Sequence, residues 1–315
     1  MKITIVGAGA MGSMFGGLLA ECGNDVTLID INDAHIGAIQ SDGLRLVTDN
    51  GDRRVKTLKI CRPEEARELP ELLVIFTKTL HTGAALQGVR HLIGPEVHVL
   101  SLQNGLGNVE KISEFASTER ILIGVTTWPA DMVAPGHVHS HGQGIVRLMT
   151  ADGNVRPIVS AVSETLSAAG LQCSSDATVW AAIWEKVAFN AALNSICAVT
   201  GCTVDQLGTT PEGSRLAEQI VVEVLSVAQR LGIEVNPAKC KANVAGAIAQ
   251  HKGHKPSMLQ DVQAGRRTEI EAINGAAVAT ADSLNMKLPT TETLLSLVRL
   301  VEARVIAWHQ AVSLS

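Results

Sequence analysis

Three polar residues recur at helical spacing within an otherwise apolar stretch of the chain. Lys186, Asn190 and Asn194 are four residues apart, so they share one face if residues 179–200 form a helix. Ammonium and amide groups on a buried face need hydrogen-bonding partners, because leaving them unpaired costs free energy. The stripe therefore either closes a network between helices or lines a cleft that binds a substrate carbonyl and carboxylate. The spacing alone favours neither interpretation.

A second group of polar residues lies further along the chain. Ser257 can cap a helix that begins at Met258. Asp261 and Glu269 are eight residues apart, which predicts that they share a face of a helix over 258–284. On spacing alone, a solvated charged face is the favoured interpretation.

The first strand of the chain is followed by a glycine-rich turn. An apolar run at 2–6 precedes a G-x-G-x-x-G motif, and a helical stretch and a second strand at 25–29 follow it. The motif consists of Gly7, Ala8, Gly9, Ala10, Met11 and Gly12. Its glycines allow a tight turn, close approach of a pyrophosphate and close packing of helix on strand. This context predicts dinucleotide binding at free amides and the positive end of a helix dipole; a glycine-rich turn of another α/β protein is the alternative.

The residue that ends the second strand indicates which dinucleotide is bound. Asp30 lies 18 residues after Gly12. A carboxylate at this place accepts hydrogen bonds from the adenosine ribose hydroxyls and repels a 2′-phosphate. The next residues, Ile31, Asn32 and Asp33, include no cation that could hold such a phosphate. We therefore predict that NADH is preferred over NADPH.

The elements that position these residues predict an α/β fold, an N-terminal Rossmann-type doubly wound sheet followed by an all-α C-terminal domain. Strand patterns cover 44–60 (one or two strands), 72–76, 97–102, 121–127 and 136–149 (an antiparallel pair). Helical patterns cover 33–40, 157–169, 179–200, 211–231, 237–250, 258–284 and 292–311. Gly7, Asp30, Lys78 and Asn104 each follow a strand, at the sheet edge where ligands bind. We expect a dinucleotide-binding domain over 1–176 and a helical substrate and catalytic domain over 177–315.

The composition argues against several classes of function. The chain has 315 residues, of which 46% are hydrophobic and 18% charged, and a net charge of −5 without a basic block. We therefore expect no nucleic-acid partner and no membrane association. The start is a strand rather than a basic segment before an apolar one, so no signal peptide is expected. Six scattered cysteines without metal-ligand spacing indicate small buried thiols, no metal site and a cytoplasmic location.

Taken together, these motifs resemble the ketopantoate reductase (2-dehydropantoate 2-reductase) family over nearly the whole chain. The most specific part is Pro256-Ser257-Met258-Leu259-Gln260-Asp261 followed by Thr268-Glu269-Ile270. The opening motif, Thr77-Lys78, Gln103-Asn104-Gly105 and the stretch from Trp184 to Asn194 occur in matching order. The resemblance implies hydride transfer from NAD(P)H to the 2-oxo carbon of ketopantoate, a small 2-oxo acid, giving the D-2-hydroxy acid pantoate.

The resemblance also implies roles for the matched residues around the substrate. Lys186 would donate a proton to the 2-oxo oxygen of the substrate. Asn190, Asn194 and Ser257 would hold the substrate carboxylate and hydroxyl. Asn104 would lie between the nicotinamide and the substrate, in contact with both.

Further roles concern the cofactor. The resemblance implies that Lys78 and the Ala130 backbone contact it. Glu269 would lie near the nicotinamide ribose and the catalytic lysine. Asp261 would not touch the ligands but would support the residues that do.

Other functions stay open at this point. NADPH-using members commonly carry a cation after the second strand, where this chain has Asp30-Ile31-Asn32-Asp33. The second hypothesis is therefore an NADH-dependent D-2-hydroxyacid dehydrogenase acting on branched or aromatic 2-oxo acids. A β-hydroxyacid dehydrogenase shares the glycine motif and a catalytic lysine, but the run from Ser257 to Glu269 argues against it. A non-catalytic NAD(H) sensor would need no proton donor.

The apolar helical pattern near the C-terminus concerns assembly. The stretch 293–305 predicts burial either against the body of the protein or against a second copy, as in a homodimer. Periodicity does not separate these two outcomes.

Overall fold

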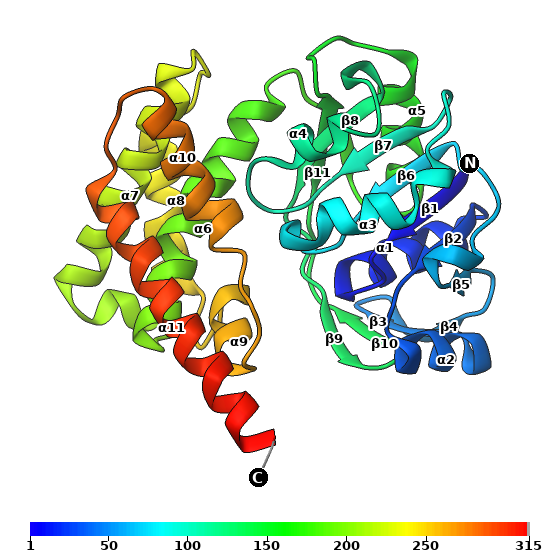
Figure 1. Ribbon diagram of the computed structural model, residues 1–315, viewed down its shortest axis with the longest axis horizontal. Helices are drawn as coiled ribbons and strands as arrows, with labels where there is room; N and C mark the ends of the chain where they lie inside the picture. The colour runs from blue at the N-terminus through cyan, green and yellow to red at the C-terminus, as the bar shows by residue number, and fades with distance from the viewer. Residues whose placement is uncertain (314–315) are drawn as a thin grey trace. The chain divides into compact units, whose positions relative to one another are not determined.

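The computed structural model describes the backbone of residues 1–313 and the side chains of residues 1–308. The chain divides into two compact units, Met1–Gln103 with Asn108–Val179, and Asn104–Gly107 with Trp180–Ser315. The first unit contains the sheets and the second is helical (Figure 1). Asn104–Gly107 belong to the second unit because the Leu106 amide donates to the carbonyl of Ala272 (2.8 Å).

A single large sheet forms the centre of the first unit. Its order is β12-β11-β8-β7-β6-β1-β2-β5. The strands are β1 (Lys2–Val6), β2 (Asp25–Ile29), β5 (Lys59–Cys61), β6 (Leu72–Ile75), β7 (His98–Ser101), β8 (Ile121–Thr126), β11 (Val146–Thr150) and β12 (Cys173–Ser175). From β5 to β8 all neighbours are parallel, and β11 runs antiparallel to β8. The order reverses direction at β1, which confirms the predicted doubly wound Rossmann-type sheet.

A smaller sheet corrects two of the strand predictions. It has the order β4-β3-β10-β9, from β3 (Leu44–Thr48), β4 (Gly51–Val55), β9 (Asp131–Ala134) and β10 (His137–Ser140). Residues 44–60 therefore supply three strands, counting the start of β5, rather than one or two. The antiparallel pair predicted over 136–149 is wrong, since β10 pairs with β3 and β9 whereas β11 joins the large sheet. Alternation shows which side chains face a core but does not identify the partner strand.

The helices of the first unit connect successive strands of the large sheet. They are α1 (Ala10–Glu21), α2 (Asp33–Asp42), α3 (Thr82–Gly88), α4 (Asn108–Ser113) and α5 (Pro157–Ala168). Each parallel strand pair needs such a crossover, because a tight hairpin can join only antiparallel strands.

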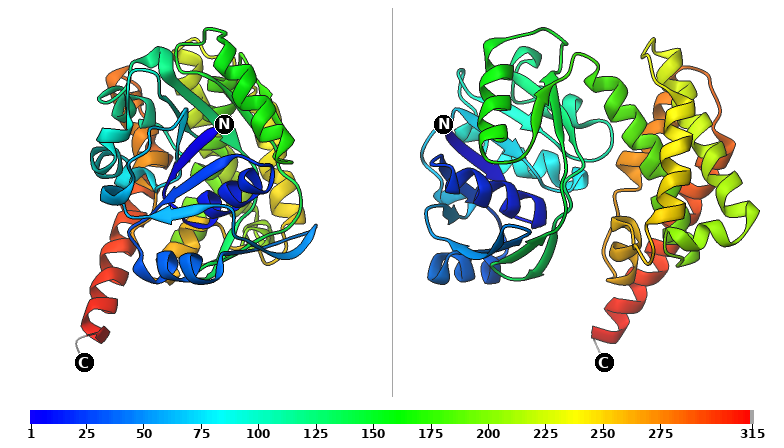
Figure 2. Two further views of the ribbon diagram at one scale, coloured as in Figure 1. Left: turned by 90° about the vertical axis from the view of Figure 1, so that its right-hand side faces the viewer. Right: turned by 180° about the vertical axis from the view of Figure 1, so that it is seen from behind.

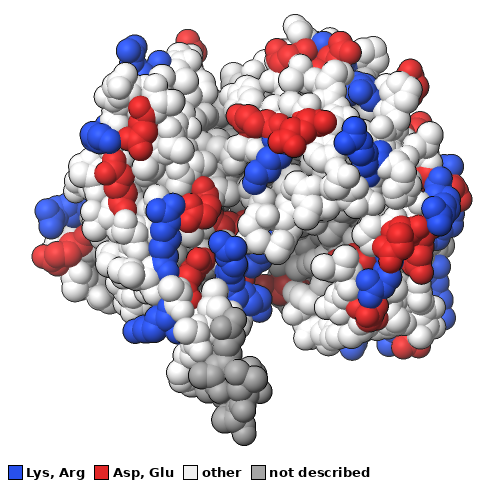
Figure 3. Space-filling view, viewed as in Figure 1, with Lys and Arg blue, Asp and Glu red and all other residues white. Residues whose placement is uncertain are grey.

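On the face shown in Figure 3, acidic and basic side chains are interspersed.

The second unit consists of helices (Figure 2), and these helices pack around one apolar core. They are α6 (Val179–Thr200), α7 (Pro211–Arg230), α8 (Pro237–Gln250), α9 (Ser257–Gln263), the π-helix η6 (Glu271–Gly275), α10 (Ala276–Ser283) and α11 (Pro289–Ser313). Fully buried Ala188, Val224 and Val298 come from α6, α7 and α11 and meet in this core. The helical C-terminal half expected from the sequence is confirmed, and α6 and α8 have the predicted bounds.

The long helix predicted over 258–284 is wrong. Helix α9 ends at Gln263, and Gly265 turns the chain with a left-handed φ of +67°. Asp261 and Glu269 therefore do not share a face of one helix. Ser257 is the first residue of α9 and makes no capping hydrogen bond; Pro256 occupies the N-cap position. Periodicity continued across the break because the residues on both sides are apolar at similar spacing.

The cysteines only partly match the expectation of small buried thiols. Cys197 and Cys240 are buried, Cys22 is exposed and the other three are half-buried, all of them unpaired. Over the residues that the structure describes, no helix combines the length and the apolar character needed to cross a membrane.

Gly12→Ala should destabilise the protein. A Cβ at this position would lie 2.0 Å from the carbonyl oxygen of Gly7, so α1 must move away from β1. We expect the free energy of unfolding to fall by at least about 2 kcal/mol. Gly37→Ala in α2 is the matched control, since nothing lies within 4 Å of its Cβ, and it should leave Tm unchanged or raise it. Equal Tm values for the Gly12 variant and the parent protein would contradict this packing argument.

Candidate functional site

The glycine motif forms a tight turn between β1 and α1. Gly7 has a φ of +95°, and a Cβ there would lie 2.6 Å from the backbone nitrogen of Thr77. Gly9 is the N-cap of α1 and is exposed, with no atom within 4 Å of its Cβ position. The first turn of α1 has no acidic residue and no side-chain cap. The amides that precede Ser13, whose own amide donates to the Gly9 carbonyl (2.8 Å), are thus available at the start of α1 to an anion such as a pyrophosphate.

Asp30 holds the turn and the following loop together. Its Oδ2 accepts from the Ala8 amide (2.8 Å), and its Oδ1 accepts from the amides of Ile31 (2.8 Å) and Asn32 (2.9 Å). A carboxylate has about four acceptor positions, so one is left for a ribose hydroxyl. The side chain is half-buried at the carboxyl end of β2, which fixes its orientation.

The ends of β6 and β7 are joined by a residue that sequence reasoning missed. The Gln103 side-chain amide donates to the carbonyl of Thr77 (2.6 Å) and to Oγ1 of Thr82 (2.8 Å). Its signal was a polar residue directly after a buried strand. Lys78 lies beside this link, at the start of the short helix η2 (Thr79–His81), and Ala130 lies in the loop between β8 and β9.

Helix α6 presents the polar stripe that the spacing predicted. Lys186, Asn190 and Asn194 all lie within this unbroken helix. Among the described residues, neither asparagine side chain has a hydrogen-bond partner, and Asn194 is only 7% exposed. The exposed Ser257 hydroxyl likewise bonds to none of them. These groups are left to water or a ligand, because buried amides are normally satisfied.

The second unit also brings an acid, an amide and the lysine together. Nδ2 of Asn104 donates to Oε2 of Glu269 (3.1 Å). Burial lowers the pKa of Lys186 to about 8, and the negative charge of Glu269 opposes this shift. A lysine with a pKa near the working pH is suited to proton transfer, since it gives up its proton readily and still carries it at neutral pH.

Asp261 has a partner in the turn that follows its own helix. It is buried, and its Oδ1 accepts from Nε of Arg266 (3.0 Å), which fixes the turn after α9. Asn274 is a further buried polar residue that the sequence analysis did not identify. Its Nδ2 donates to the Ala191 carbonyl (3.4 Å), while its Oδ1 has no partner among the described atoms. The π-helix that carries Asn274 is thereby tied to α6 between Asn190 and Asn194; such helices are frequent at functional sites.

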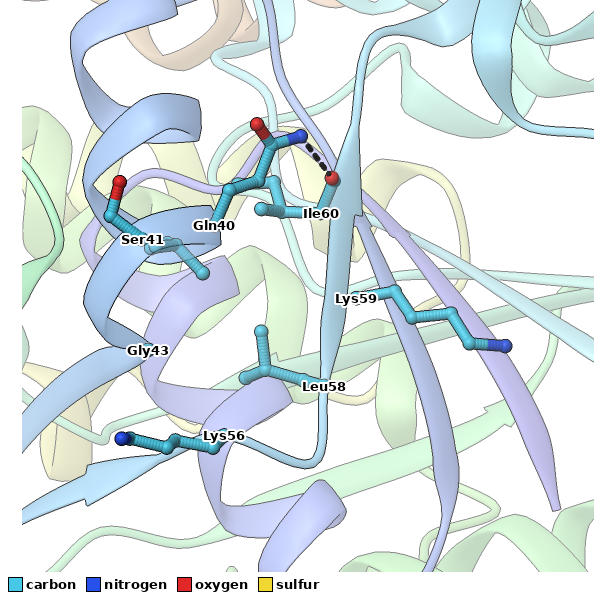
Figure 4. Close-up of a pocket in the computed structure, with 8 residues that line it drawn as sticks. Gln40, Ser41, Gly43, Lys56, Leu58, Lys59 and Ile60 are labelled. Carbon is cyan, nitrogen blue, oxygen red and sulfur yellow. Dashed lines mark hydrogen bonds between the residues drawn. The ribbon is translucent and has the colours of Figure 1, made fainter.

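The first unit also has a surface pocket of about 410 Å³. Figure 4 shows it between the end of α2 and the residues before and within β5. It is lined by Ile39, Gln40, Ser41, Gly43, Lys56, Leu58, Lys59 and Ile60. None of the predicted site residues lines this pocket.

Comparison with known families and proteins assigns the chain. A model described as "Ketopantoate reductase PanE/ApbA" matches residues 3–153, and its C-terminal counterpart matches residues 178–302. The chain belongs to the ketopantoate reductase family. Membership makes it an oxidoreductase that works with a nicotinamide cofactor, in agreement with the glycine motif.

Individual relatives cover nearly the full length. A 2-dehydropantoate 2-reductase of Streptococcus pyogenes serotype M6 is 36% identical over 96% of this chain and 98% of its own. One from Halobacterium salinarum is 30% identical over 96% and 99%.

Solved structures show the same architecture. D-mandelate dehydrogenase in complex with NADH and anilino(oxo)acetate superimposes with a TM-score of 0.92 at 31% identity, covering 97% of this chain and 99% of that one. A 2-dehydropantoate 2-reductase from Geobacter metallireducens reaches a TM-score of 0.90 at 29% identity, covering 95% and 99%.

The lowered pKa of Lys186 predicts a pH-dependent stability. As pH rises through about 8, the folded protein loses this proton, whereas the unfolded chain keeps it until near 10.5. The unfolded state then binds more protons, so the free energy of unfolding should rise with pH relative to Lys186→Met. Urea unfolding of both proteins between pH 7 and 10 measures the difference. A difference that does not change with pH would mean that the lysine keeps its ordinary pKa.

Proposed function

We propose that this protein is a 2-dehydropantoate 2-reductase, which reduces ketopantoate to pantoate with a nicotinamide cofactor. The observation that carries the proposal is the stripe of Lys186, Asn190 and Asn194 on α6. The negative charge of Glu269 raises the pKa of this lysine against the effect of burial. The 36% identity to a curated 2-dehydropantoate 2-reductase over nearly the whole chain supports it. Residues 1–176 would then bind the dinucleotide, and residues 177–315 would hold the substrate and the proton donor.

The catalytic roles follow from charge. The bound dihydronicotinamide supplies the hydride. Negative charge develops on the 2-oxo oxygen, and the Lys186 ammonium stabilises this charge and delivers the proton. Glu269 keeps the lysine protonated by opposing the effect of burial on its pKa. Asn104, which donates to Glu269, orients this carboxylate, and its amide would also contact the nicotinamide and the substrate.

The substrate is held by uncharged donors in this proposal. The unpartnered amides of Asn190 and Asn194 bind its carboxylate, and the Ser257 hydroxyl binds its hydroxyl. Amide and hydroxyl donors fit a carboxylate acceptor and position the 2-oxo carbon for attack.

The first unit supplies its own set of proposed cofactor contacts. The turn formed by Gly7, Ala8, Gly9, Ala10, Met11 and Gly12 would hold the pyrophosphate through the amides at the start of α1, because the Gly7 and Ala8 amides already donate to the Ile29 carbonyl and to Asp30. Asp30 would accept from the ribose. Lys78 and the Ala130 backbone contact the cofactor further along the sheet edge. Because the carboxylate of Asp30 repels a 2′-phosphate, we propose that NADH is preferred over NADPH.

A second candidate shares the same residues. An NADH-dependent D-2-hydroxyacid dehydrogenase is favoured by Asp30 and by the similarity to D-mandelate dehydrogenase solved with NADH. Steady-state oxidation of NADH and NADPH with ketopantoate, 2-oxoisovalerate and phenylpyruvate separates the two. Fast ketopantoate turnover supports the reductase, whereas slow ketopantoate turnover with fast reduction of the others supports the dehydrogenase. No turnover on any of them, with cofactor still bound, would indicate a sensor.

A location in the cytoplasm and a homodimer complete the proposal. Free thiols, six in number, suit a reducing compartment. Leu300 of α11 is 67% exposed, and Leu297, about one turn before it on the same helix, is 38% exposed. We propose that this apolar surface covers its counterpart on a second copy, because burying it in a dimer removes it from water.

Lys186→Ala should lower kcat at least about 100-fold, because the proton donor is lost. The dissociation constant for NADH should stay unchanged, since Lys186 is not among the residues proposed to bind the cofactor. Lys252→Ala, at an exposed position after α8, is the matched control and should keep the parent kcat. Near-normal turnover in Lys186→Ala would remove this lysine from the mechanism.

Leu300→Asp should dissociate the proposed dimer. A charge within a buried apolar contact is costly, whereas at an exposed position of a monomer it is harmless. Sedimentation equilibrium of the parent protein and the variant checks this. A parent protein that sediments as a monomer at micromolar concentration refutes the dimer.

A further inference from the structure

The loop after β2 contains an ion pair that joins two strand ends. Asp33, the first residue of α2, contacts the guanidinium of Arg62, which directly follows β5. The residues that directly follow Asp30 include no cation. The structure supplies one from the neighbouring strand instead.

Hydrogen bonds of two backbone amides fix the position of the Arg62 backbone relative to Asp30. The Asp30 amide donates to the carbonyl of Cys61 (3.2 Å), and the Arg62 amide donates to Oε2 of Glu65 (2.8 Å). Strands β2 and β5 pair in parallel with Ile29 opposite Cys61. Asp30 directly follows β2 and Arg62 directly follows β5, so the backbones of these two residues lie side by side. The Arg62 side chain then extends to the first turn of α2.

A phosphate on the ribose 2′-oxygen would enter this same region. Asp30 is the proposed acceptor for the ribose hydroxyls, and the loop of Ile31 and Asn32 lies directly beyond it. Guanidinium is the side chain best suited to bind phosphate, through paired N–H donors. Here these donors already face a carboxylate, so the loop holds a suitable cation but keeps it engaged.

We propose that Asp33 is a second determinant of cofactor preference, because its ion pair with Arg62 withholds that guanidinium from a 2′-phosphate. This inference rests on the proposed NAD(P)H site. Asp30 repels the phosphate directly, and Asp33 engages Arg62, the guanidinium beside this loop that could attract the phosphate. The preference for NADH thus depends on a residue beyond the strand end as well as on Asp30.

The test is Asp33→Asn, which keeps the size of the side chain and removes its charge. Fluorescence titration should show that NADPH binds about fivefold more tightly than to the parent protein, with NADH binding unchanged. Adenosine 2′,5′-bisphosphate is a probe without nicotinamide. The ratio of its affinity to that of 5′-AMP should rise by a similar factor in the variant.

A second substitution identifies the source of the gain. Adding Arg62→Gln to Asp33→Asn should abolish the tighter NADPH binding, because the released cation is then gone. Asp52→Asn is the matched control, since it removes the same charge from the Arg45–Asp52 ion pair (2.6 Å) of the smaller sheet. It should leave the ratio of NADPH to NADH affinity unchanged.

Two results would overturn the inference. One is an unchanged affinity ratio in Asp33→Asn, and the other is a gain that survives Arg62→Gln or appears equally in Asp52→Asn. Neither affects the proposed reductase, which is judged by turnover of 2-oxo acids. Conversely, intact cofactor binding without any turnover would refute the proposed reductase and leave this comparison of binding constants valid.

Discussion

The proposed ligand-binding edge of the first unit depends on the Asp30 carboxylate. This carboxylate accepts hydrogen bonds from amides of the turn after β1 and of the loop after β2. The backbone amide of Asp30 donates to the carbonyl of Cys61 at the end of β5. Three strand ends are therefore held by one residue. A carboxylate is suited to this because it has several acceptor positions and a charge that strengthens each hydrogen bond. The same residue that would select the cofactor also shapes the backbone that would hold it.

The second unit depends on a balance between two opposed effects on Lys186. Burial disfavours the ammonium, while the carboxylate of Glu269 favours it, and the resulting pKa of about 8 keeps both forms accessible. Asn104 donates to this carboxylate and so fixes its direction. A fully solvated lysine would hold its proton more strongly at neutral pH, and without the acid the pKa of the buried lysine would be lower still.

Features encoded by local sequence were predictable, and those created by long-range pairing were not. The glycine turn, Asp30 and the stripe on α6 follow from spacings within a few residues, and the structure has them on the expected elements. The pairing of β10 with β3, the break at Gly265 and the contact of Arg62 with Asp33 each depend on segments that meet only in the folded chain. Asn274 was hidden for the same reason, since its partner Ala191 lies on another helix. The catalytic and binding roles of the site residues stay predictions.

The membership of Asn104–Gly107 in the helical unit has a consequence for biosynthesis. The hydrogen bond from Asn104 to Glu269 spans 165 residues of sequence. On a ribosome that adds about 5–20 residues per second, the partner of Asn104 emerges on the order of ten seconds after it. During that interval the first unit already has the chain it needs for its own strands, whereas Leu106 and Asn104 still lack their hydrogen-bonding partners Ala272 and Glu269. The loop that carries Asn104 is therefore among the last parts of the sheet-forming half of the sequence to reach its final conformation, and the proposed proton-transfer site is completed only when the C-terminal third has been made.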